Sequence, residues 1–284
     1  MKRGRMTERL RDLTPGIAAC RLSEHAARIL RLNSSMWSGD YPDWSSAAAS
    51  CRPHGPGPMC EAYARAHRAL AAGSAQHERD GILFEDARPE WPLLTALASL
   101  ATAPRPSRTV LDFGGGFGAG FFQNRAWLDR FGPIQWAVVE TAEVVRAART
   151  VVDDPAVRFF ESIQEATDTL GPPDVVVAAG VLPYIPDPNR TLEELAALRA
   201  PWTLIERLAV LRSAPRHRLT RQVVPAFIYR MESPFWVFAR DLLTREIASR
   251  FRIAGTSVSA CDDPGWIGGQ RFEWAGFVLE PAIR

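Results

Sequence analysis

Cysteine is scarce in this sequence: four residues, Cys20, Cys51, Cys60 and Cys261, are spread over 284 positions. Cysteines that are so few and so scattered exclude a disulfide framework of the kind that holds small secreted domains together. Cys51 and Cys60 flank His54, but the spacing does not fit a zinc site and no fourth ligand stands near them. We therefore expect free thiols and no bound metal.

Long apolar runs are also missing, and none approaches the roughly 18 residues that a membrane-spanning helix needs. The charged residues at the N-terminus are not followed by a continuous apolar segment, which argues against a secretory signal. The 34 basic residues nearly balance the 32 acidic ones, so the net charge of +2 gives no overall attraction to nucleic acid. We expect a cytoplasmic protein with no membrane span and no nucleic-acid partner, and a homodimer stays open.

Residues 1–105 are predicted to form a helical cap or lid ahead of the main domain. Several segments there place apolar residues at helical spacing, among them "LSEHAARILRL", "MCEAYARAHRALAAG" and "PEWPLLTALASLA". Between them, "MWSGDYPDWSSAAAS" and "CRPHGPGP" are rich in Trp, Gly, Pro and Ser and are predicted to be loops. The stretch "TAPRPSR" is typical of a linker, so a second domain is expected over residues 106–284.

From residue 108 onward, short apolar segments of strand length alternate with helical segments. The predicted strands are "RTVLDF", "IQWAVVE", "VRFF", "PDVVVAAG" and "PWTLIER". This alternation predicts right-handed crossovers and a mostly parallel sheet covered on both faces, the α/β architecture of Rossmann-like folds. Near the end, "RIAGTSVSA" and "RFEWAGFVLE" have only a loop between them, which predicts an antiparallel strand pair.

The loop after the first of these strands is rich in glycine. Glycine lets a ligand approach the main chain closely, and ligands of open parallel sheets lie beyond the carboxyl ends of the strands. Gly114, Gly116 and Ala119 fit the pattern G-x-G-x-x-A of nicotinamide- and flavin-binding folds. The same loop, with Asp112 before it and Gly118 at its end, also fits D-x-G-x-G-x-G. The acid favours a cationic ligand over a pyrophosphate, and the methionine part of S-adenosylmethionine carries an ammonium group and a sulfonium.

The second strand ends in Glu140, a carboxylate that can accept hydrogen bonds from the ribose hydroxyls of either kind of cofactor. The C-terminal antiparallel pair distinguishes a fold that binds S-adenosylmethionine from one that binds a nicotinamide or flavin, because this pair is the usual ending of the sheet in class I methyltransferases. The sequence resembles that superfamily over roughly residues 105–280, with "VLDFGGGFG" and "WAVVE" as its first two motifs. The resemblance implies a seven-stranded Rossmann-like sheet and S-adenosylmethionine as cofactor.

Further segments resemble a narrower group of bacterial proteins that are identified as methyltransferases and are often encoded beside surface-polysaccharide genes. The shared segments are "DYPDWSSAAAS", "VLDFGGGFG", "WAVVE", "AAGVLPYIPDP" and "RLTRQVVPAFIY". This resemblance implies methyl transfer without naming the acceptor. The sequence departs from the group where "CRPHGPGP" stands in place of a segment that usually contains "GY".

The positions of these segments predict which residues surround the cofactor. Those expected at the methionine and ribose are Asp112, Phe113, Gly114, Gly115, Gly116, Gly118 and Glu140. Ser162 and Ile163, after the third strand, are expected beside the adenine. Ala179 and Gly180, after the fourth strand, are expected to present their backbone to the methionine part.

Methyl transfer needs an acceptor held in line with the methyl group, and a base if the acceptor is a hydroxyl or an amine. The catalytic candidates are Tyr184, Glu206, His217 and Tyr229. Histidine is the side chain that titrates nearest neutral pH, so His217 is the preferred base. The candidates for binding the acceptor are Arg207, Arg216, Arg218 and Gln222, since arginine pairs with carboxylates and phosphates through two hydrogen bonds. The alternative is that residues 212–222 form a solvated loop.

Together these features predict an S-adenosylmethionine-dependent methyltransferase that acts on a small molecule or a saccharide, with anionic acceptors among the candidates. O-methylation is favoured over N- or C-methylation. Two alternatives stay open: a nicotinamide-dependent oxidoreductase, and a binding module that keeps the fold without catalysing a reaction.

Overall fold

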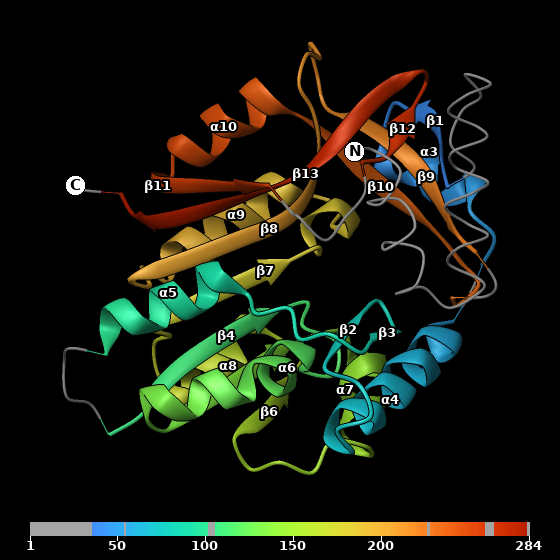
Figure 1. Ribbon diagram of the computed structural model, residues 1–284. Coiled ribbons are helices and arrows are strands. Elements are labelled where there is room, and N and C mark those ends of the chain that lie inside the picture. The colour runs from blue at the N-terminus through green and yellow to red at the C-terminus, as the bar shows by residue number, and fades with distance from the viewer. Residues whose placement is uncertain (1–35, 54, 102–105, 226–227, 259–263, 283–284) are drawn as a thin grey trace, which may run out of the picture.

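The computed structural model describes residues 36–53, 55–101, 106–225, 228–258 and 264–282. Among these residues, five parallel strands form the centre of a sheet in the order β6–β5–β4–β7–β8 (Figure 1). They are β4 (Arg108–Phe113), β5 (Ile134–Val139), β6 (Val157–Phe160), β7 (Val175–Ala179) and β8 (Trp202–Leu211). Nearly every side chain of β4, β5 and β7 is buried, which is typical of parallel strands covered on both faces.

Two antiparallel strands continue the sheet beyond β8. β13 (Gln270–Pro281) pairs with β8 on one side and with β11 (Phe251–Val258) on the other. The order β6–β5–β4–β7–β8–β13–β11 therefore contains both the parallel centre and the C-terminal antiparallel pair that the sequence predicts. The predicted Rossmann-like α/β fold is confirmed.

The sheet is larger than the predicted seven strands, since the described residues place 11 strands in it. The additional ones are β1 (Trp37–Tyr41), β9 (Arg218–Val224), β10 (Met231–Ala239) and β12 (Trp266–Ile267). β10 runs parallel to the end of β8, and β9 and β1 follow it as antiparallel neighbours. Much of the stretch 212–222 is therefore a strand and not a loop, because Leu219 and Thr220 are buried against β10.

Helices cover both faces of the sheet (Figure 1). On one face lie α5 (Trp91–Leu100), α6 (Ala119–Leu128) and α7 (Ala142–Arg149), and on the other lie α8 (Ile163–Leu170), α9 (Pro188–Ala197) and α10 (Arg240–Ala248). Each face has its own apolar cluster, with Leu97 and Trp136 in the first and Leu195 and Phe238 in the second. Within the described ranges, no helix is long and apolar enough to span a membrane.

The described part of residues 1–105 is a mixture of helices and strands, which corrects the prediction of a helical region. It contains α3 (Trp44–Ser50), α4 (Gly57–Ala71) and α5, together with β1 and a hairpin of β2 (His77–Arg79) and β3 (Ile82–Phe84). β1 pairs with β9 of the main sheet. The stretch "MWSGDYPDWSSAAAS", predicted as a loop, is therefore a strand followed by a helix. The helices predicted before residue 36 and the predicted domain boundary at 105 lie outside the described residues.

Candidate functional site

The loop after β4 has a backbone that favours glycine. Gly114, Gly116 and Gly118 have φ values of 74°, 58° and 76°, a region that other residues rarely adopt. Gly115 is restricted for another reason, since a Cβ atom there would lie 2.3 Å from a carboxylate oxygen of Asp112. The carboxyl end of β4 is therefore bordered by bare main chain.

Asp112 lies in β4 beneath this loop, with 5% of its surface exposed. The indole Nε1–H of Trp136 donates a hydrogen bond to its Oδ2 at 3.0 Å. Burial raises the pKa of the Asp112 carboxyl to about 7; the indole hydrogen bond opposes this rise and the charge of Glu140 adds to it. A cation bound beside such a carboxyl would favour its ionised form.

Glu140 follows β5 and reaches back to the glycine loop. Its Oε1 accepts a hydrogen bond from the backbone N–H of Gly116 at 3.2 Å, and its Oε2 accepts one from Thr141 at 3.0 Å. Burial raises the pKa of the Glu140 carboxyl, and these two hydrogen bonds oppose the rise. A carboxylate has about four lone-pair sites, so Glu140 can accept further hydrogen bonds from hydroxyl groups.

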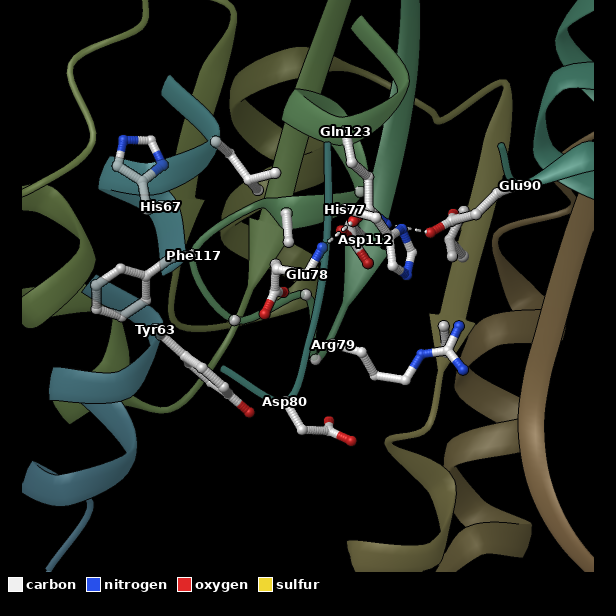
Figure 2. A pocket seen from close by; sticks show the side chains of 18 of the residues that line it. Tyr63, His67, His77, Glu78, Arg79, Asp80, Glu90, Asp112, Phe117 and Gln123 are labelled. Atoms are coloured by element: carbon white, nitrogen blue, oxygen red, sulfur yellow. Dashed lines mark hydrogen bonds between the residues drawn. The ribbon is translucent and has the colours of Figure 1, made fainter. Parts of the chain in front are cut away.

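A cavity opens between the glycine loop, α4 and the β2–β3 hairpin, as Figure 2 shows. The remaining walls come from the N-terminal half of α6, from the end of β7 and from Arg207 in the middle of β8. Polar side chains dominate the hairpin side, where Glu78, Arg79 and Asp80 line the cavity in sequence, and Glu90 and Gln123 add further polar groups to the lining. The carboxyl ends of the central strands and the hairpin thus enclose one polar space.

The hairpin turns at Asp80 and Gly81, whose φ values of 53° and 78° are both positive, as a type I′ turn requires. Arg79 and Ile82 pair directly on either side of this two-residue turn. The backbone N–H of Gly81 donates to Oε2 of Glu78 at 3.0 Å, which adds a side-chain hydrogen bond to the turn. The turn therefore holds Asp80 in a fixed position beside the cavity.

Arg207 enters the cavity from a bulge in β8. The register between β8 and β13 shifts between Ala275 and Phe277, and Arg207 opposite this shift has a φ of 57°. Bulges re-aim side chains near functional sites, and here the guanidinium is aimed at the hairpin. Its Nη2 lies 2.8 Å from Oδ2 of Asp80, and its Nη1 lies 3.4 Å from Oδ1. Two residues in uncommon backbone conformations thus form one ion pair beside the cavity, a feature that often accompanies function.

Three glutamates around the cavity resemble Asp112 in their titration. Burial raises the pKa of Glu78, Glu90 and Glu206 to about 7 in each case, and the charge of Arg79 opposes the rise at all three. The amide of Gln123 donates to Oε1 of Glu90 at 2.6 Å, and the charge of Glu90 adds to the rise at Glu206. The cavity is rich in acids that are partly protonated near neutral pH, and it is suited to a cationic ligand.

No group of three or more His, Cys, Asp or Glu side chains in the described part of the chain is arranged to hold a metal ion. Cys51 and Cys60 are free thiols, and His54 lies outside the described residues. The expected absence of a metal cofactor stays a prediction.

The family model for the methyltransferase domain matches residues 83–244, more than half of the chain. The chain belongs to this family. The protein is therefore a methyltransferase that uses S-adenosylmethionine as its methyl donor, and the sequence-based prediction of enzyme class and cofactor is confirmed. The narrower resemblance to proteins encoded beside surface-polysaccharide genes stays a prediction.

Solved structures similar to the methyltransferase include the N-terminal domain of EvdMO1 in the presence of SAH and D-fucose. The identity is 16% and the TM-score is 0.44, with 77% of this chain and 97% of that chain covered. The glycopeptide N-methyltransferase MtfA complexed with SAM has 16% identity and a TM-score of 0.43, covering 66% and 94%. A SAM-dependent methyltransferase from Mesorhizobium loti has 14% identity and a TM-score of 0.41, covering 69% and 99%. No protein with a curated description matches the sequence significantly.

Part of the predicted cofactor site of the methyltransferase lines the cavity: Asp112, Gly114, Gly115, Gly116 and Ala179. These residues come from the ends of β4 and β7, neighbouring strands whose carboxyl ends meet at the same edge of the sheet. The sequence motifs therefore predicted residues that the fold brings together. Their contact with the cofactor stays a prediction.

The remaining predicted cofactor residues have structural contacts outside the cavity lining. Phe113 and Ile163 pack on the apolar cluster beneath α8, α9 and α10. Gly118 is the N-cap residue of α6, and the side chain of Ser162 caps α8 by accepting a backbone hydrogen bond at 3.1 Å. Gly180 has a φ of 73° and donates its N–H to the carbonyl of Glu206 in β8 at 2.8 Å. These contacts do not test the prediction that Ser162 and Ile163 lie beside the adenine of the cofactor, which stays a prediction.

His217 does not line the cavity. Its Nε2 lies 2.9 Å from Oε2 of Glu246 in α10, and its Nδ1 accepts the backbone N–H of Ala239 at 2.9 Å. Its ring also stands edge-on to Phe238. Both ring nitrogens are engaged, one with the last turn of α10 and the other with the residue before that helix, so the structure does not support His217 as the base.

The arginines predicted to bind an anionic acceptor are paired with carboxylates instead. Arg216 and Arg218 both pair with Asp40 of β1, at 2.8 Å and 3.5 Å. The neighbouring pairs are Arg212–Glu273 at 2.9 Å and Arg221–Glu232 at 3.7 Å. The run connects β9 and the turn before it with surrounding strands, and the predicted anion site at residues 212–222 is not supported.

Of the other predicted catalytic and acceptor residues, Arg207 is the one that belongs to the cavity lining. Glu206 precedes it in the same bulge of β8. The hydroxyl of Tyr184, in a short 3₁₀ helix after β7, donates to Oε1 of Gln222 at 2.8 Å. Tyr229 is buried against α4.

Sequence analysis missed the hairpin residues of the cavity. The pair Asp80-Gly81 between "HER" and "ILF" is the signal that could have found them, because Asp-Gly between two short strand segments is typical of a type I′ hairpin. Tyr63 and Glu90 carry no comparable signal. Tertiary packing alone brings them to the glycine loop.

Proposed function

We propose that the methyltransferase binds the methionine part of S-adenosylmethionine in the cavity and methylates a small molecule. The observation that carries this proposal is an acid-rich space beside a glycine loop without side chains. The methionine part has two positive groups, an ammonium and a sulfonium, and one carboxylate. Asp112 and Glu90 are suited to the positive groups, and Arg79 is suited to the carboxylate through charge-assisted hydrogen bonds.

The glycine loop supports this proposal because its main chain borders the cavity at Gly114, Gly115 and Gly116. A Cβ atom at Gly114 would lie 2.4 Å from a methyl carbon of Val181, and one at Gly116 would lie 3.2 Å from the ring of Tyr63, so neighbouring side chains already fill those positions. Glycine therefore fits this close packing and leaves the main chain of the loop accessible from the cavity.

For the rest of the cofactor, we propose contacts on the other side of the glycine loop. The carboxylate of Glu140, already held by the N–H groups of Gly116 and Thr141, accepts hydrogen bonds from the ribose hydroxyls. Ser162 and Ile163, at the start of α8, lie beside the adenine, and the backbone of Ala179 and Gly180 faces the methionine part. These assignments place the methyl group near the bulge of β8.

We propose that, within the predicted cap of residues 1–105, α4 and the β2–β3 hairpin act as a lid on the catalytic domain of residues 106–284, while β1 and α5 belong to the sheet and its helical layer. When bound, S-adenosylmethionine supplies a methyl carbon that the positive sulfur makes electrophilic. The residues of the chain hold the acceptor in line with that carbon and exclude water, which supplies much of the rate by positioning. A cytoplasmic location, a saccharide acceptor and a homodimer stay predictions.

The charge of the cavity argues against a nicotinamide-dependent oxidoreductase, and an activity measurement separates a methyltransferase from a binding module without catalysis. A nicotinamide cofactor would bring the negative charges of its pyrophosphate against Asp112 and Glu90. A binding module without catalysis would bind S-adenosylmethionine and methylate no acceptor. Tyr184, Glu206 and Tyr229 remain the candidates for contact with the acceptor.

Replacing Arg79 with glutamine tests where the methionine part binds. We expect about tenfold weaker binding of S-adenosylhomocysteine, because one charge-assisted hydrogen bond is lost. Binding of 5′-methylthioadenosine should not change, since this compound has the adenine, ribose and sulfur but no amino-acid group. Isothermal titration calorimetry measures both affinities.

Arg216→Gln is the matched control, because Arg216 pairs with Asp40 of β1 outside the cavity lining. It should leave both affinities unchanged. Equal losses for the two compounds in the Arg79 variant, or no loss for either, would mean that the methionine part binds elsewhere.

A further inference from the structure

Tyr63 and Asp80 line the cavity together, and Tyr184 and Tyr229 are two further buried tyrosines that the charge of Asp80 reaches. The charge of Asp80 adds to the raised pKa values of Tyr63, Tyr184 and Tyr229, which burial raises first, so Asp80 lies within electrostatic reach of all three hydroxyls. The rings of Tyr63 and Tyr229 stand edge to face with 6.2 Å between their centroids. In Figure 2 the hydroxyl of Tyr63 is directed toward Asp80. We call these three tyrosines and Asp80 the tyrosine chamber.

The tyrosine chamber adjoins the proposed methionine site on two sides. The ring of Tyr63 lies 3.2 Å from the position of a Cβ atom at Gly116 in the glycine loop. Nη1 of Arg207, the ion-pair partner of Asp80, lies 3.0 Å from the corresponding position at Gly180. A molecule in the chamber would therefore stand next to the end of β7, where the methyl group is expected.

The chamber carries negative charge and aromatic surface together. The raised pKa values keep the tyrosine hydroxyls neutral, so the charge comes from carboxylates. Glu78 and Glu140, from the hairpin and the end of β5, add negative potential at Tyr63, while Arg207 from β8 offsets Asp80. Aromatic faces attract cations, and rings arranged around an ammonium group are a recurrent means of recognising it.

We propose that the methyl acceptor is an amine, bound as an ammonium ion between the tyrosine rings and the carboxylate of Asp80. This rests on the proposed function and replaces the preference for a hydroxyl acceptor that the sequence alone gave. An anionic acceptor would be repelled by Asp80 and by the negative faces of the rings. A hydroxyl acceptor would gain nothing from the charge of the chamber.

The reaction then requires one proton transfer before methylation. The ammonium loses a proton to water, which can reach it because the side chain of Asp80 beside it is 43% exposed. The lone pair of the neutral nitrogen forms a bond with the methyl carbon while the carbon–sulfur bond breaks and its electron pair stays on sulfur. The positive charge of the sulfonium thereby moves to the methylated nitrogen, and S-adenosylhomocysteine is the second product.

Paired probes test the chamber in the complex with S-adenosylhomocysteine. The pairs are isobutylamine and isobutanol, benzylamine and benzyl alcohol, and tryptamine and tryptophol, each titrated calorimetrically. In at least one pair we expect the amine to bind roughly tenfold more tightly than the alcohol, since a charge-assisted contact contributes about 1.5–3 kcal/mol. Asp80→Asn should remove this preference, and asparagine tolerates the positive φ at position 80. Asp40→Asn, the same change at the carboxylate that pairs with Arg216, should keep it.

Arg207→Gln separates recognition of the amine from a purely structural role of the ion pair. If Asp80 only anchors the hairpin, losing either partner weakens amine binding. If Asp80 binds the ammonium, Arg207→Gln strengthens amine binding, because a competing cation has been removed. No preference for the amine in any pair, including no binding at all, would overturn the chamber while S-adenosylhomocysteine still binds. Failure of the unmodified protein to bind S-adenosylhomocysteine would instead overturn the proposed function.

Discussion

Replacing Glu140 with alanine is expected to weaken binding of S-adenosylmethionine roughly ten- to a hundredfold. Its carboxylate is held at the glycine loop by the N–H groups of Gly116 and Thr141, and the proposed ribose contact uses the remaining acceptor capacity. Loss of a hydrogen bond to a charged group costs about 1.5–3 kcal/mol, which corresponds to that range of affinity. Unlike Arg79→Gln, this change should weaken binding of 5′-methylthioadenosine as well, since that compound keeps the ribose.

The control for this prediction is Glu143→Ala. Glu143 is an exposed carboxylate in the first turn of α7, three positions further along the chain. It removes the same charge from the same region without touching the glycine loop. Equal affinities in the Glu140 and Glu143 variants, both near that of the unmodified protein, would show that the ribose is not bound at Glu140.

Gly114→Ala is expected to lower the melting temperature by about 10 °C. An alanine there would have a φ of 74°, which costs about 1–2 kcal/mol. Its Cβ would lie 2.4 Å from a methyl carbon of Val181, and such overpacking costs about 1–3 kcal/mol more. A loss of about 1 kcal/mol lowers the melting temperature by roughly 2–4 °C in a protein of this size class.

Gly73→Ala provides the matched control for the thermal measurement. Gly73 has a similar φ of 68°, but a Cβ atom there would meet nothing within 4 Å. It should lower the melting temperature by only about 3 °C, because the backbone term acts alone. Differential scanning fluorimetry measures both melting temperatures. Equal shifts in the two variants would show that the glycine loop can move away from Val181.

The parallel centre of the sheet could be predicted from local sequence alone. β4 is a short strand segment that ends in Asp112 and Phe113 and is followed by glycines, and each of these signals acts within a few residues. The C-terminal strand pair is predictable for the same reason, since only a loop separates its two segments. These local features were sufficient for the fold class and the cofactor.

The walls of the cavity could not be predicted in the same way, because they come from distant parts of the chain. Tyr63 of α4 and Asp80 of the hairpin meet Arg207 only after both elements pack over the cavity edge of the sheet. Arg207 faces the hairpin because of a bulge in β8, and no local pattern specifies that bulge.

His217 and the arginine run show a second limit of local sequence patterns. Their side-chain chemistry suits a base and an anion site, but chemistry alone does not reveal a partner that lies elsewhere in the chain. Glu246 in α10 holds the imidazole, and Asp40 in β1 pairs with Arg216 and Arg218. Polar residues near each other in sequence were therefore assigned to one site, although the structure uses them to join separate elements.

The most direct test of the cofactor assignment is a calorimetric titration with S-adenosylmethionine and with NAD at pH 6 and pH 8. Burial raises the pKa of Asp112, Glu78 and Glu90 to about 7, so these carboxyls are largely protonated at pH 6 and largely ionised at pH 8. A bound cation favours their ionised forms, so we predict that S-adenosylmethionine binds more tightly at pH 8 and that NAD does not bind at either pH. Binding of NAD alone would contradict the cofactor, and an affinity for S-adenosylmethionine that stays constant or falls from pH 6 to pH 8 would contradict its place in the acid-rich cavity.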